Sequence, residues 1–137
     1  MRLTDHTDYS LRVLMYLNQE KRLVTLNELT ENLGISKNNL IKASSQLSKL
    51  NYIETTRGRS GGLSIRKHAG KITLKEIILK TEESFHFAEC FANKESNCTF
   101  LPGCLLKHAL NDAFHAFLAS LSEQTLDDVT HLRNRRK

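Results

Sequence analysis

The sulfur chemistry of this chain is confined to three cysteines, Cys90, Cys98 and Cys104, which are spaced C-x7-C-x5-C. Three cysteines cannot all pair, so a closed disulfide framework is excluded and one thiol always remains. Thiolates are the ligands that soft metals and iron–sulfur clusters prefer. Three of them leave one coordination position to a ligand from elsewhere, and a weaker ligand there would let an external molecule attack the metal. The spacing therefore favours a cluster or metal site with an open fourth position.

Four interpretations of the cysteines remain open on spacing alone. An iron–sulfur cluster fits three closely spaced thiolates and one outside ligand. A zinc site usually has a complete Cys/His set with C-x2-C pairs, which this chain lacks. A thiol redox switch could pair Cys90 with Cys98 or Cys104. Three inert buried cysteines form the last interpretation, and the polar residues 93–97 argue against it.

The fourth ligand has candidates near the cysteines and in the first helix. His108 follows Cys104 closely, and His86 precedes Cys90. Asp8 is distant in sequence, but a hard oxygen ligand from another helix or subunit would make a weak position. A histidine on a helix, such as His108 or His115, is more often a packed or solvated residue than a ligand.

The segments that must position these cysteines are predicted to be mostly helical. A first amphipathic helix is expected over 3–18, where apolar residues recur at three- and four-residue spacings. Thr25 and Glu28 form a capping-box pattern that begins a short helix, and Gly34 permits the left-handed turn that ends it. Ser36 is the expected N-cap of the next helix. The apolar face of that helix consists of Leu40, Ala43, Leu47 and Leu50.

These two short helices and the residues after them predict a winged helix-turn-helix. Two helices joined by a glycine-containing turn are the signature of the helix-turn-helix. The residues that follow, 52–56 and 63–65, have strand propensity and flank the basic, glycine-rich turn 57–62. This β-hairpin supplies the wing, so the unit is expected to occupy residues 1–70.

The cysteine loop, about 84–104, is predicted to lie between two helices. Thr73 and Glu76 form another capping box, which opens a helix running to about Lys80. After the loop, the very apolar pattern over about 105–122 predicts a long helix. A helix that is apolar over so wide an arc needs more than one burial partner. The partner is either a second copy in a two-fold dimer or the core of a monomer.

Together these elements predict a mainly α fold with a small β-hairpin, built as one compact domain. The winged helix-turn-helix occupies 1–70, and the cysteine loop and dimerisation helix occupy 71–137. At 137 residues the chain can bury a core without disulfides or a metal. The basic tail, 131–137, is expected to fray.

Positive charge is concentrated in the winged half. Residues 1–70 hold 11 Lys/Arg and 6 Asp/Glu, whereas residues 71–137 hold 9 of each. Such enrichment is typical of a surface that binds a polyanion, although charge alone leaves a merely solvated surface open. At the start of the second helix of a helix-turn-helix, side chains meet base edges, and basic groups nearby grip phosphates. The candidate residues for binding double-stranded DNA are therefore Ser36, Lys37, Asn38, Asn39 and Lys42 on that helix and Arg57 and Arg59 on the hairpin.

Other classes of function find little support in the sequence. No apolar run has the length of a transmembrane helix, and Asp5 and Asp8 stand where a signal peptide would need apolar residues. We therefore expect a cytoplasmic protein without a membrane partner. The chain has no Walker loop, dinucleotide-binding glycine pattern, H-E-x-x-H or nucleophile elbow, so an enzyme is not expected.

Five segments, in order along the chain, resemble the Rrf2 family of winged-helix regulators, and within it the nitric-oxide-sensing NsrR-type repressors. They are the opening M-R-L-T-D-H-T-D-Y-S-L-R-V-L, the helix segment I-S-K-N-N-L-I-K, the wing R-G-R-S-G-G-L, the approach K-T-E-E-S-F-H-F-A-E-C-F and the helix start L-P-G-C-L-L-K-H-A-L. The resemblance covers almost the whole chain.

The resemblance implies a homodimeric DNA-binding repressor that carries one iron–sulfur cluster per subunit on Cys90, Cys98 and Cys104. In such repressors an aspartate of the T-D-Y segment completes the cluster from the partner subunit, and Asp8 occupies that position here. Nitric oxide attacks the iron, the cluster degrades and DNA is released. We expect a 4Fe-4S cluster rather than a 2Fe-2S cluster.

Other regulators that use the same cysteines remain open. A cluster-assembly regulator of the IscR type uses a histidine soon after its third cysteine, and His108 is the nearest one here. An iron-responsive repressor of the RirA type shares the wide first cysteine gap. A thiol-redox DNA-binding regulator would need no cluster, and a zinc-stabilised interaction module would bind no DNA. Asp8 and the T-D-Y-S-L-R segment favour nitric oxide as the signal.

Overall fold

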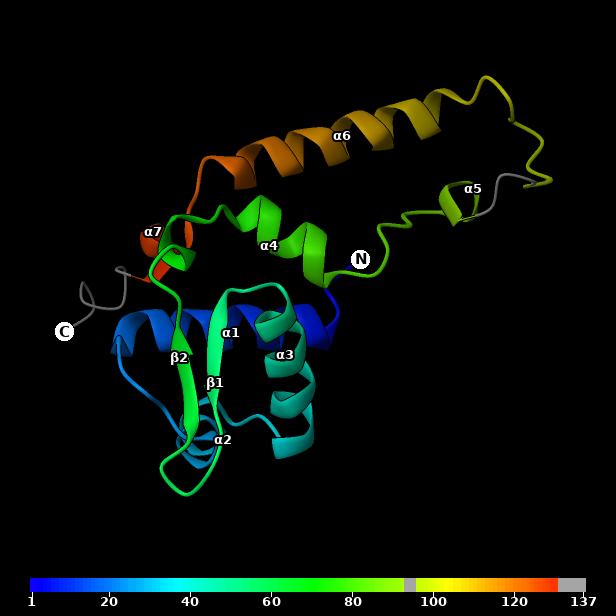
Figure 1. Cartoon of the computed structure of the whole chain (residues 1–137). Helices are drawn as coiled ribbons and strands as arrows, with labels where there is room; N and C mark the ends of the chain where they lie inside the picture. The colour runs from blue at the N-terminus through cyan, green and yellow to red at the C-terminus, as the bar shows by residue number, and fades with distance from the viewer. Residues whose placement is uncertain (93–95, 131–137) are drawn as a thin grey trace.

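The structure is a computed structural model and describes residues 1–92 and 96–130 of the chain (Figure 1). The described part consists of helices and one two-stranded antiparallel sheet, so the predicted mainly α fold with a small β-hairpin is confirmed. The expected fraying of the tail, 131–137, falls outside the described residues. In chain order the elements are α1 (Asp5–Glu20), α2 (Leu26–Leu33), α3 (Lys37–Lys49), β1 (Ile53–Thr56), β2 (Gly62–Ile65), a short 3-10 turn (Ala69–Lys71), α4 (Leu74–Thr81), α5 (Glu89–Ala92), α6 (Leu105–Ser122) and α7 (Leu126–Thr130).

Helix α1 begins and ends two residues later than the sequence predicts. Leu3 lies outside the helix because the Thr4 side chain is the cap, and it accepts the amide N–H of Thr7 at 3.3 Å. At the other end the helix continues to Glu20. Lys21 then adopts a left-handed conformation, with φ of 52°, which stops the helix.

The short helices of the winged unit begin where their cap residues predict. Oγ1 of Thr25 accepts the amide N–H of Glu28 at 3.1 Å, and Oγ of Ser36 accepts that of Asn39 at 3.3 Å. These bonds satisfy amides that the start of a helix leaves free. Gly34 ends α2 in the left-handed conformation, with φ of 65°. A tight turn therefore joins α2 to α3, as a helix-turn-helix requires.

The β-hairpin is attached to the segment that precedes α2. Its strands pair antiparallel, with Ile53 opposite Ile65. Val24 and Leu63 exchange two backbone hydrogen bonds of 2.8 and 2.7 Å. A Cβ on Gly62 would lie 2.4 Å from the carbonyl oxygen of Val24, so this close approach requires glycine. The hairpin is therefore held in a fixed place beside the helix-turn-helix.

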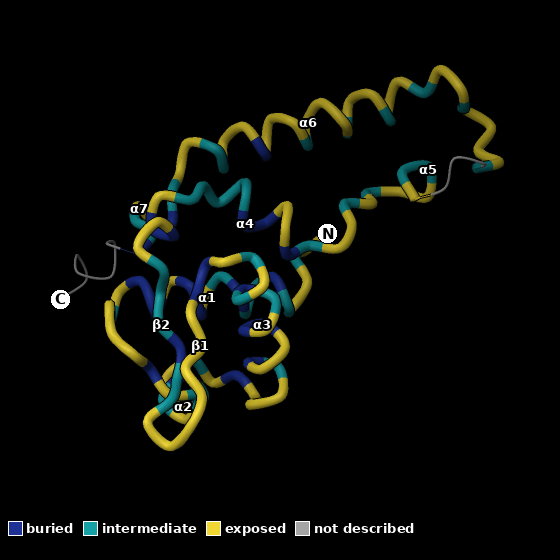
Figure 2. Tube along the Cα trace, in the orientation of Figure 1, coloured by how far each residue is buried: buried dark blue, intermediate teal, exposed yellow. Residues whose placement is uncertain are grey.

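The hydrophobic core lies between α1, α2, α3, the hairpin, α4 and α7 (Figure 2). The predicted apolar face of α3 is confirmed at Leu40, Ala43 and Leu47, whereas Leu50 at the helix end is half-buried. Apolar burial of this kind is the main stabilising contribution to a small domain. The large apolar side chains with no exposed surface are Leu14, Leu17, Leu29, Leu40, Leu47, Ile53, Ile77 and Leu126.

Helix α6 extends beyond this core, and the cysteine segment lies at its far end (Figures 1 and 2). Its bounds match the predicted 105–122. In the described structure Leu118 is the one buried residue of α6, whereas Leu105 is 83% exposed and Leu106 is 67% exposed. The alternative in which this helix is the central core helix of a monomer is therefore wrong. We call residues 83–92 and 96–122 the arm and the rest of the described chain the body.

Phenylalanines hold the start of the cysteine segment against α6. The rings of Phe85 and Phe87 lie 5.0 and 5.3 Å from that of Phe114 on α6, measured between ring centroids. Phe91 on α5 lies edge-on to Phe87 at 5.8 Å. Aromatic pairs of this geometry are favourable beyond the area that they bury. The arm therefore folds back on itself, with the segment before the cysteines lying along the helix that follows them.

Candidate functional site

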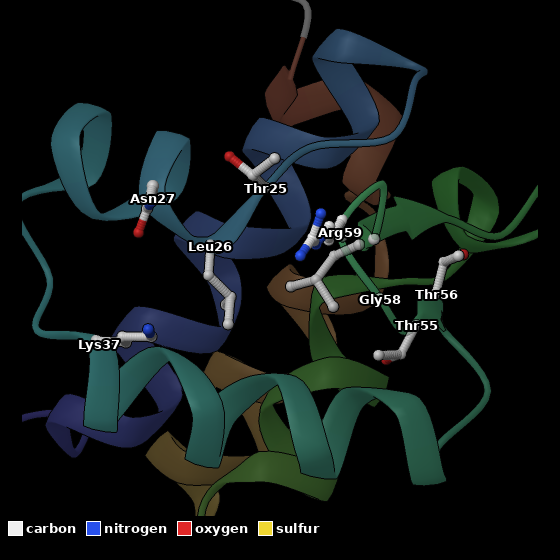
Figure 3. Close-up of a pocket in the computed structure, with 11 residues that line it drawn as sticks. Thr25, Leu26, Asn27, Lys37, Thr55, Thr56, Gly58 and Arg59 are labelled. Carbon is white, nitrogen blue, oxygen red and sulfur yellow. The ribbon is translucent and has the colours of Figure 1, made fainter.

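The first candidate site is the surface shared by the start of α3 and the β-hairpin. Lys37, the first residue of α3, and Arg59, in the hairpin turn, line one hollow of about 320 Å³ (Figure 3). Among the described residues that line this hollow, none is acidic. Two cations without a neighbouring acid suit a phosphate group. The fold thus brings together two of the residues that the sequence predicts for DNA binding.

The remaining predicted DNA-binding residues differ in how accessible they are. Asn38 and Lys42 are exposed on α3 at a spacing of four, which places them on one face of the helix. Arg57 is exposed in the hairpin turn. Asn39 is half-buried, and the oxygen of Ser36 already accepts a hydrogen bond as the helix cap. Asn38, Lys42 and Arg57 are therefore freer to meet a ligand than Ser36 and Asn39.

Sequence reasoning missed the start of α2 as part of this surface. Thr25, Leu26 and Asn27 line the same hollow as Lys37 and Arg59 (Figure 3). A helix N-terminus carries partial positive charge and N–H groups without helical partners. The capping-box pattern located the beginning of the helix, but only the fold places it beside the hairpin turn.

The second candidate site is the cysteine segment of the arm. Cys104 is the N-cap of α6, and its sulfur accepts the backbone N–H of Lys107 at 3.4 Å. The partial positive charge of a helix N-terminus is favourable for a negatively charged ligand. Cys104 thus combines a fixed backbone position with surroundings that suit a metal-bound sulfur.

Cys90 lies on α5, and a contact of its neighbour Phe91 holds this helix close to the start of α6. Nζ of Lys107 lies 5.7 Å from the centre of the Phe91 ring, within the range of a cation–π contact. The backbone of the same lysine binds the sulfur of Cys104. Lys107 therefore joins the segments that carry the first and third cysteines, a role that the sequence did not suggest.

Cys98 is exposed on the loop between the other two cysteines, and all three are free thiols. Within residues 1–92 and 96–130, no three His, Cys, Asp or Glu side chains are gathered closely enough to hold a metal ion. The donor set of three thiols fits an iron–sulfur cluster.

Asp8 lies near the start of α1, and its carboxylate is paired with Arg12 one turn later. Nε of Arg12 donates to Oδ1 of Asp8 at 3.2 Å, and a second guanidinium nitrogen donates to the other carboxylate oxygen. The side chains of Asp8 and Arg12 are 44% and 47% exposed, so an outside group can reach the carboxylate. Arg12 was not predicted as a site residue. The spacing of opposite charges at i and i+4 is the signal that could have found it.

The histidines considered as alternative ligands are all exposed. His86 lies before α5, and His108 and His115 lie on α6. None of them belongs to a three-ligand group within the part of the chain that the structure describes.

Known structures of winged-helix transcription regulators have this fold. The chain superposes on CymR of Staphylococcus aureus with a TM-score of 0.73 at 21% identity, over 93% of this chain and 97% of that protein. It superposes on IscR of T. potens with a TM-score of 0.73 at 19% identity, over 99% of this chain and 89% of that one. Similarity at this identity establishes the fold, a winged helix-turn-helix followed by a long helix.

The chain belongs to the Rrf2 family of iron-dependent transcriptional regulators, whose model matches residues 3–132. It is 43% identical over 131 residues to the HTH-type transcriptional regulator NsrR of Bacillus licheniformis, which covers 94% of this chain and 92% of that protein. It is 39% identical over 135 residues to protein aau3 of Rhizobium meliloti, over 97% of this chain and 87% of that protein. The family predicted from the motifs is thus confirmed. Because the family consists of transcriptional regulators, the prediction of a non-enzymatic function is confirmed too.

Among the described residues, no helix combines the length and the apolar character that crossing a bilayer requires.

Proposed function

We propose that this protein is a DNA-binding transcriptional repressor whose operator affinity is controlled by an iron–sulfur cluster that reacts with nitric oxide. The observation that carries the proposal is the arm, which presents the free thiols of Cys90, Cys98 and Cys104 outside a body with its own core. None of these thiols belongs to the hydrophobic core of the body. Identity of 43% with regulators named NsrR supports the assignment. A regulator of transcription in a bacterial cell would act in the cytoplasm, where we expect this protein.

DNA binding is assigned to α3 and the β-hairpin. Lys37 and Arg59, with the start of α2 beside them, would hold a backbone phosphate. Asn38 and Lys42 are exposed on α3, where asparagine suits adenine and lysine suits guanine or phosphate. We assign homodimerisation to the exposed apolar face of α6. Two copies would then place two α3 helices on successive half-sites of the operator.

The cluster site is assigned to Cys90, Cys98 and Cys104, with Asp8 of the partner subunit as the fourth ligand. An iron–sulfur cluster, for which we favour the 4Fe-4S form, would supply iron to which nitric oxide binds. A carboxylate is a harder and weaker ligand for such iron than a thiolate, so the Asp8 position is the most open to attack. In the structure Asp8 pairs with Arg12, so as a cluster ligand this carboxylate would have two alternative partners. Helix α1 packs against α3. A change of the Asp8 partner from Arg12 to iron would therefore affect the position of the DNA-binding surface.

Anaerobic purification tests the proposal. Iron and acid-labile sulfide are measured, and the visible spectrum and operator affinity are followed during titration with nitric oxide. A brown protein that bleaches at low stoichiometry and loses operator affinity supports the proposal. A colourless protein without iron after attempted reconstitution, or one with zinc alone, refutes it and favours thiol or zinc chemistry.

The fourth ligand is tested by Asp8→Ala. We expect the cluster to form but to be less stable or to respond differently to nitric oxide, because one of its four ligands is missing. Asp5→Ala is the matched control, since Asp5 is an exposed acid in the same turn of α1. Unchanged spectra and nitric oxide kinetics in Asp8→Ala would remove Asp8 from the ligand set.

An iron-responsive repressor is the second candidate, because the family is described as iron-dependent. It would use the same cysteines and the same DNA-binding surface, so only the signal separates the two functions. Adding an iron chelator in the absence of nitric oxide distinguishes them. Prompt release of operator DNA by the chelator alone would favour iron sensing, whereas release that requires nitric oxide supports the first proposal.

A further inference from the structure

Gln46, on the DNA-recognition helix α3, joins α1 and α4 through its side-chain amide. Its Oε1 accepts a hydrogen bond from Nε2 of His6 on α1. Its Nε2 donates to the backbone carbonyl of Lys80 at 2.8 Å. Lys80 lies in the last turn of α4, where carbonyl groups have no partner within the helix. One side chain thus links three helices, and it caps the end of one of them.

The end of α4 is also bound to the start of α1. Glu82, the C-cap residue of α4, accepts hydrogen bonds from the backbone N–H and the hydroxyl of Thr4, both at 3.1 Å. Thr4 in turn caps α1. A shift of either helix end is therefore transmitted to the other, and both ends are bonded to the amide of Gln46.

This junction lies close in sequence to Asp8 and to the start of the arm that carries the cysteines. The arm leaves the body directly after Glu82, and Asp8 follows His6 by two residues on α1. Because the chain runs from the end of α4 into the arm, a displacement of the arm would act first on the end of α4. Asp8 lies near the start of α1, so if it held the iron of the partner subunit's cluster, a change there would act first on this end of the helix. The Gln46 amide is bonded to both helix ends, so a displacement of either end would act on it.

We propose that Gln46 is the positioning residue that couples the state of the cysteine site to the orientation of α3. The inference rests on the proposed cluster-controlled DNA binding. A carboxamide both donates and accepts, which a carboxylate or an apolar side chain of similar size cannot do. Hydrogen bonds are directional, whereas apolar packing between helices tolerates small sliding. The Gln46 amide therefore holds α3 in register with the two helix ends that the cluster would move.

Operator affinity of Gln46→Ala, measured with and without the cluster, tests this proposal. In the native protein the two affinities should differ by a factor on the order of 5–150, the range typical of coupling between two sites. In Gln46→Ala we expect the factor to fall toward one, while iron content and the visible spectrum remain native. In the cluster-free variant, amide hydrogen exchange at the end of α4 should be faster, because the Lys80 carbonyl loses its partner.

Gln46→Glu removes the donor to the Lys80 carbonyl and keeps the acceptor for His6. It places a carboxylate against the carbonyl of Lys80, so we expect it too to reduce the factor. It also keeps the side chain almost unchanged in size, so it serves as the test where Gln46→Ala unfolds. The matched control is Gln124→Ala, because Gln124 is an exposed glutamine outside α3. This variant should keep the native ratio of operator affinities with and without the cluster.

The possible results are distinct. A native factor in both Gln46 variants, with a native spectrum, overturns the role of Gln46 while the proposed function stands. A native protein whose operator affinity is the same with and without the cluster overturns both. A reduced factor in both variants, with the cluster intact and Gln124→Ala unaffected, supports the proposal.

Discussion

The body and the arm of this protein differ in how many of their apolar and polar side chains find partners within the chain. In the body, large apolar residues such as Leu14 have no exposed surface, and the buried amide of Asn18 donates to Asp127 at 2.8 Å across 109 residues of sequence. In the arm, all three cysteines are free thiols. Helix α6 buries Leu118 alone among its residues in the described structure.

This difference separates a region that is complete within one chain from one that is not. The body has a core and internal polar partners. The arm has exposed apolar side chains and free cysteine thiols. Regions that respond to ligands generally come from the less stable parts of a fold. Substitutions in the core of the body should therefore reduce stability, and those at the cysteines and the exposed apolar residues of the arm should reduce function.

The largest expected effect is complete loss of the cluster in Cys98→Ala. We expect no bound iron and no tight operator binding, because two thiolates do not hold the cluster. Stability of the cluster-free protein should change by less than about 0.5 kcal/mol, since Cys98 is exposed. Iron analysis, operator binding and urea unfolding measure the three quantities. A variant that lacks iron but binds its operator normally would contradict control of DNA binding by the cluster. The control is Thr99→Ala, because Thr99 is an exposed neighbour of Cys98.

The next effect tests the body. Leu47→Ala should lower the free energy of unfolding by about 2–5 kcal/mol, because the side chain is fully buried and its truncation leaves a cavity. The loss should be the same at every protein concentration, since the contacts lie within one chain. Urea unfolding at several concentrations measures it. A loss below about 1 kcal/mol would contradict the assignment of Leu47 to a tightly packed core.

The apolar face of the arm gives a smaller and different effect. Leu106→Ser should weaken self-association about tenfold, equivalent to about 1.4 kcal/mol, because it places a hydroxyl in the proposed dimer contact. Sedimentation over a range of concentrations measures the dimer dissociation constant. Asn111→Ala, at an exposed polar position of α6, is the control. An unchanged dissociation constant would show that Leu106 lies outside any dimer contact.

The smallest effect concerns Tyr52 and Glu76 in the body. The Tyr52 hydroxyl donates to Oε1 of Glu76 at 2.8 Å and lowers the pKa of that carboxyl. The lowered pKa stabilises the fold above the ordinary glutamate pKa, and this contribution is lost as pH falls through the lowered value. Tyr52→Phe should cost about 1 kcal/mol or less at neutral pH, and the difference should shrink in acid. Thermal unfolding between pH 3 and 7 tests this; a difference that grows in acid would contradict it.

The sequence alone determined the features that depend on neighbours within about four residues. The caps at Thr25, Ser36 and Thr73, the left-handed Gly34 and the bounds of α6 lie where the sequence predicts them. Helix capping and helical periodicity are local, so they can be read directly from the order of residues. The cysteine pattern and the five motifs likewise identified the Rrf2 family.

The tertiary structure decided which distant residues meet. It placed Lys37 and Arg59 in one hollow, and it set the amide of Gln46 between His6 and Lys80. It also showed that Leu105, Leu106 and Phe117 on α6 are exposed, whereas periodicity could not distinguish this helix from a buried core helix. A local pattern specifies an element and its apolar face. The path of the whole chain decides what that face and the side chains beyond it meet, because those contacts join residues far apart in sequence.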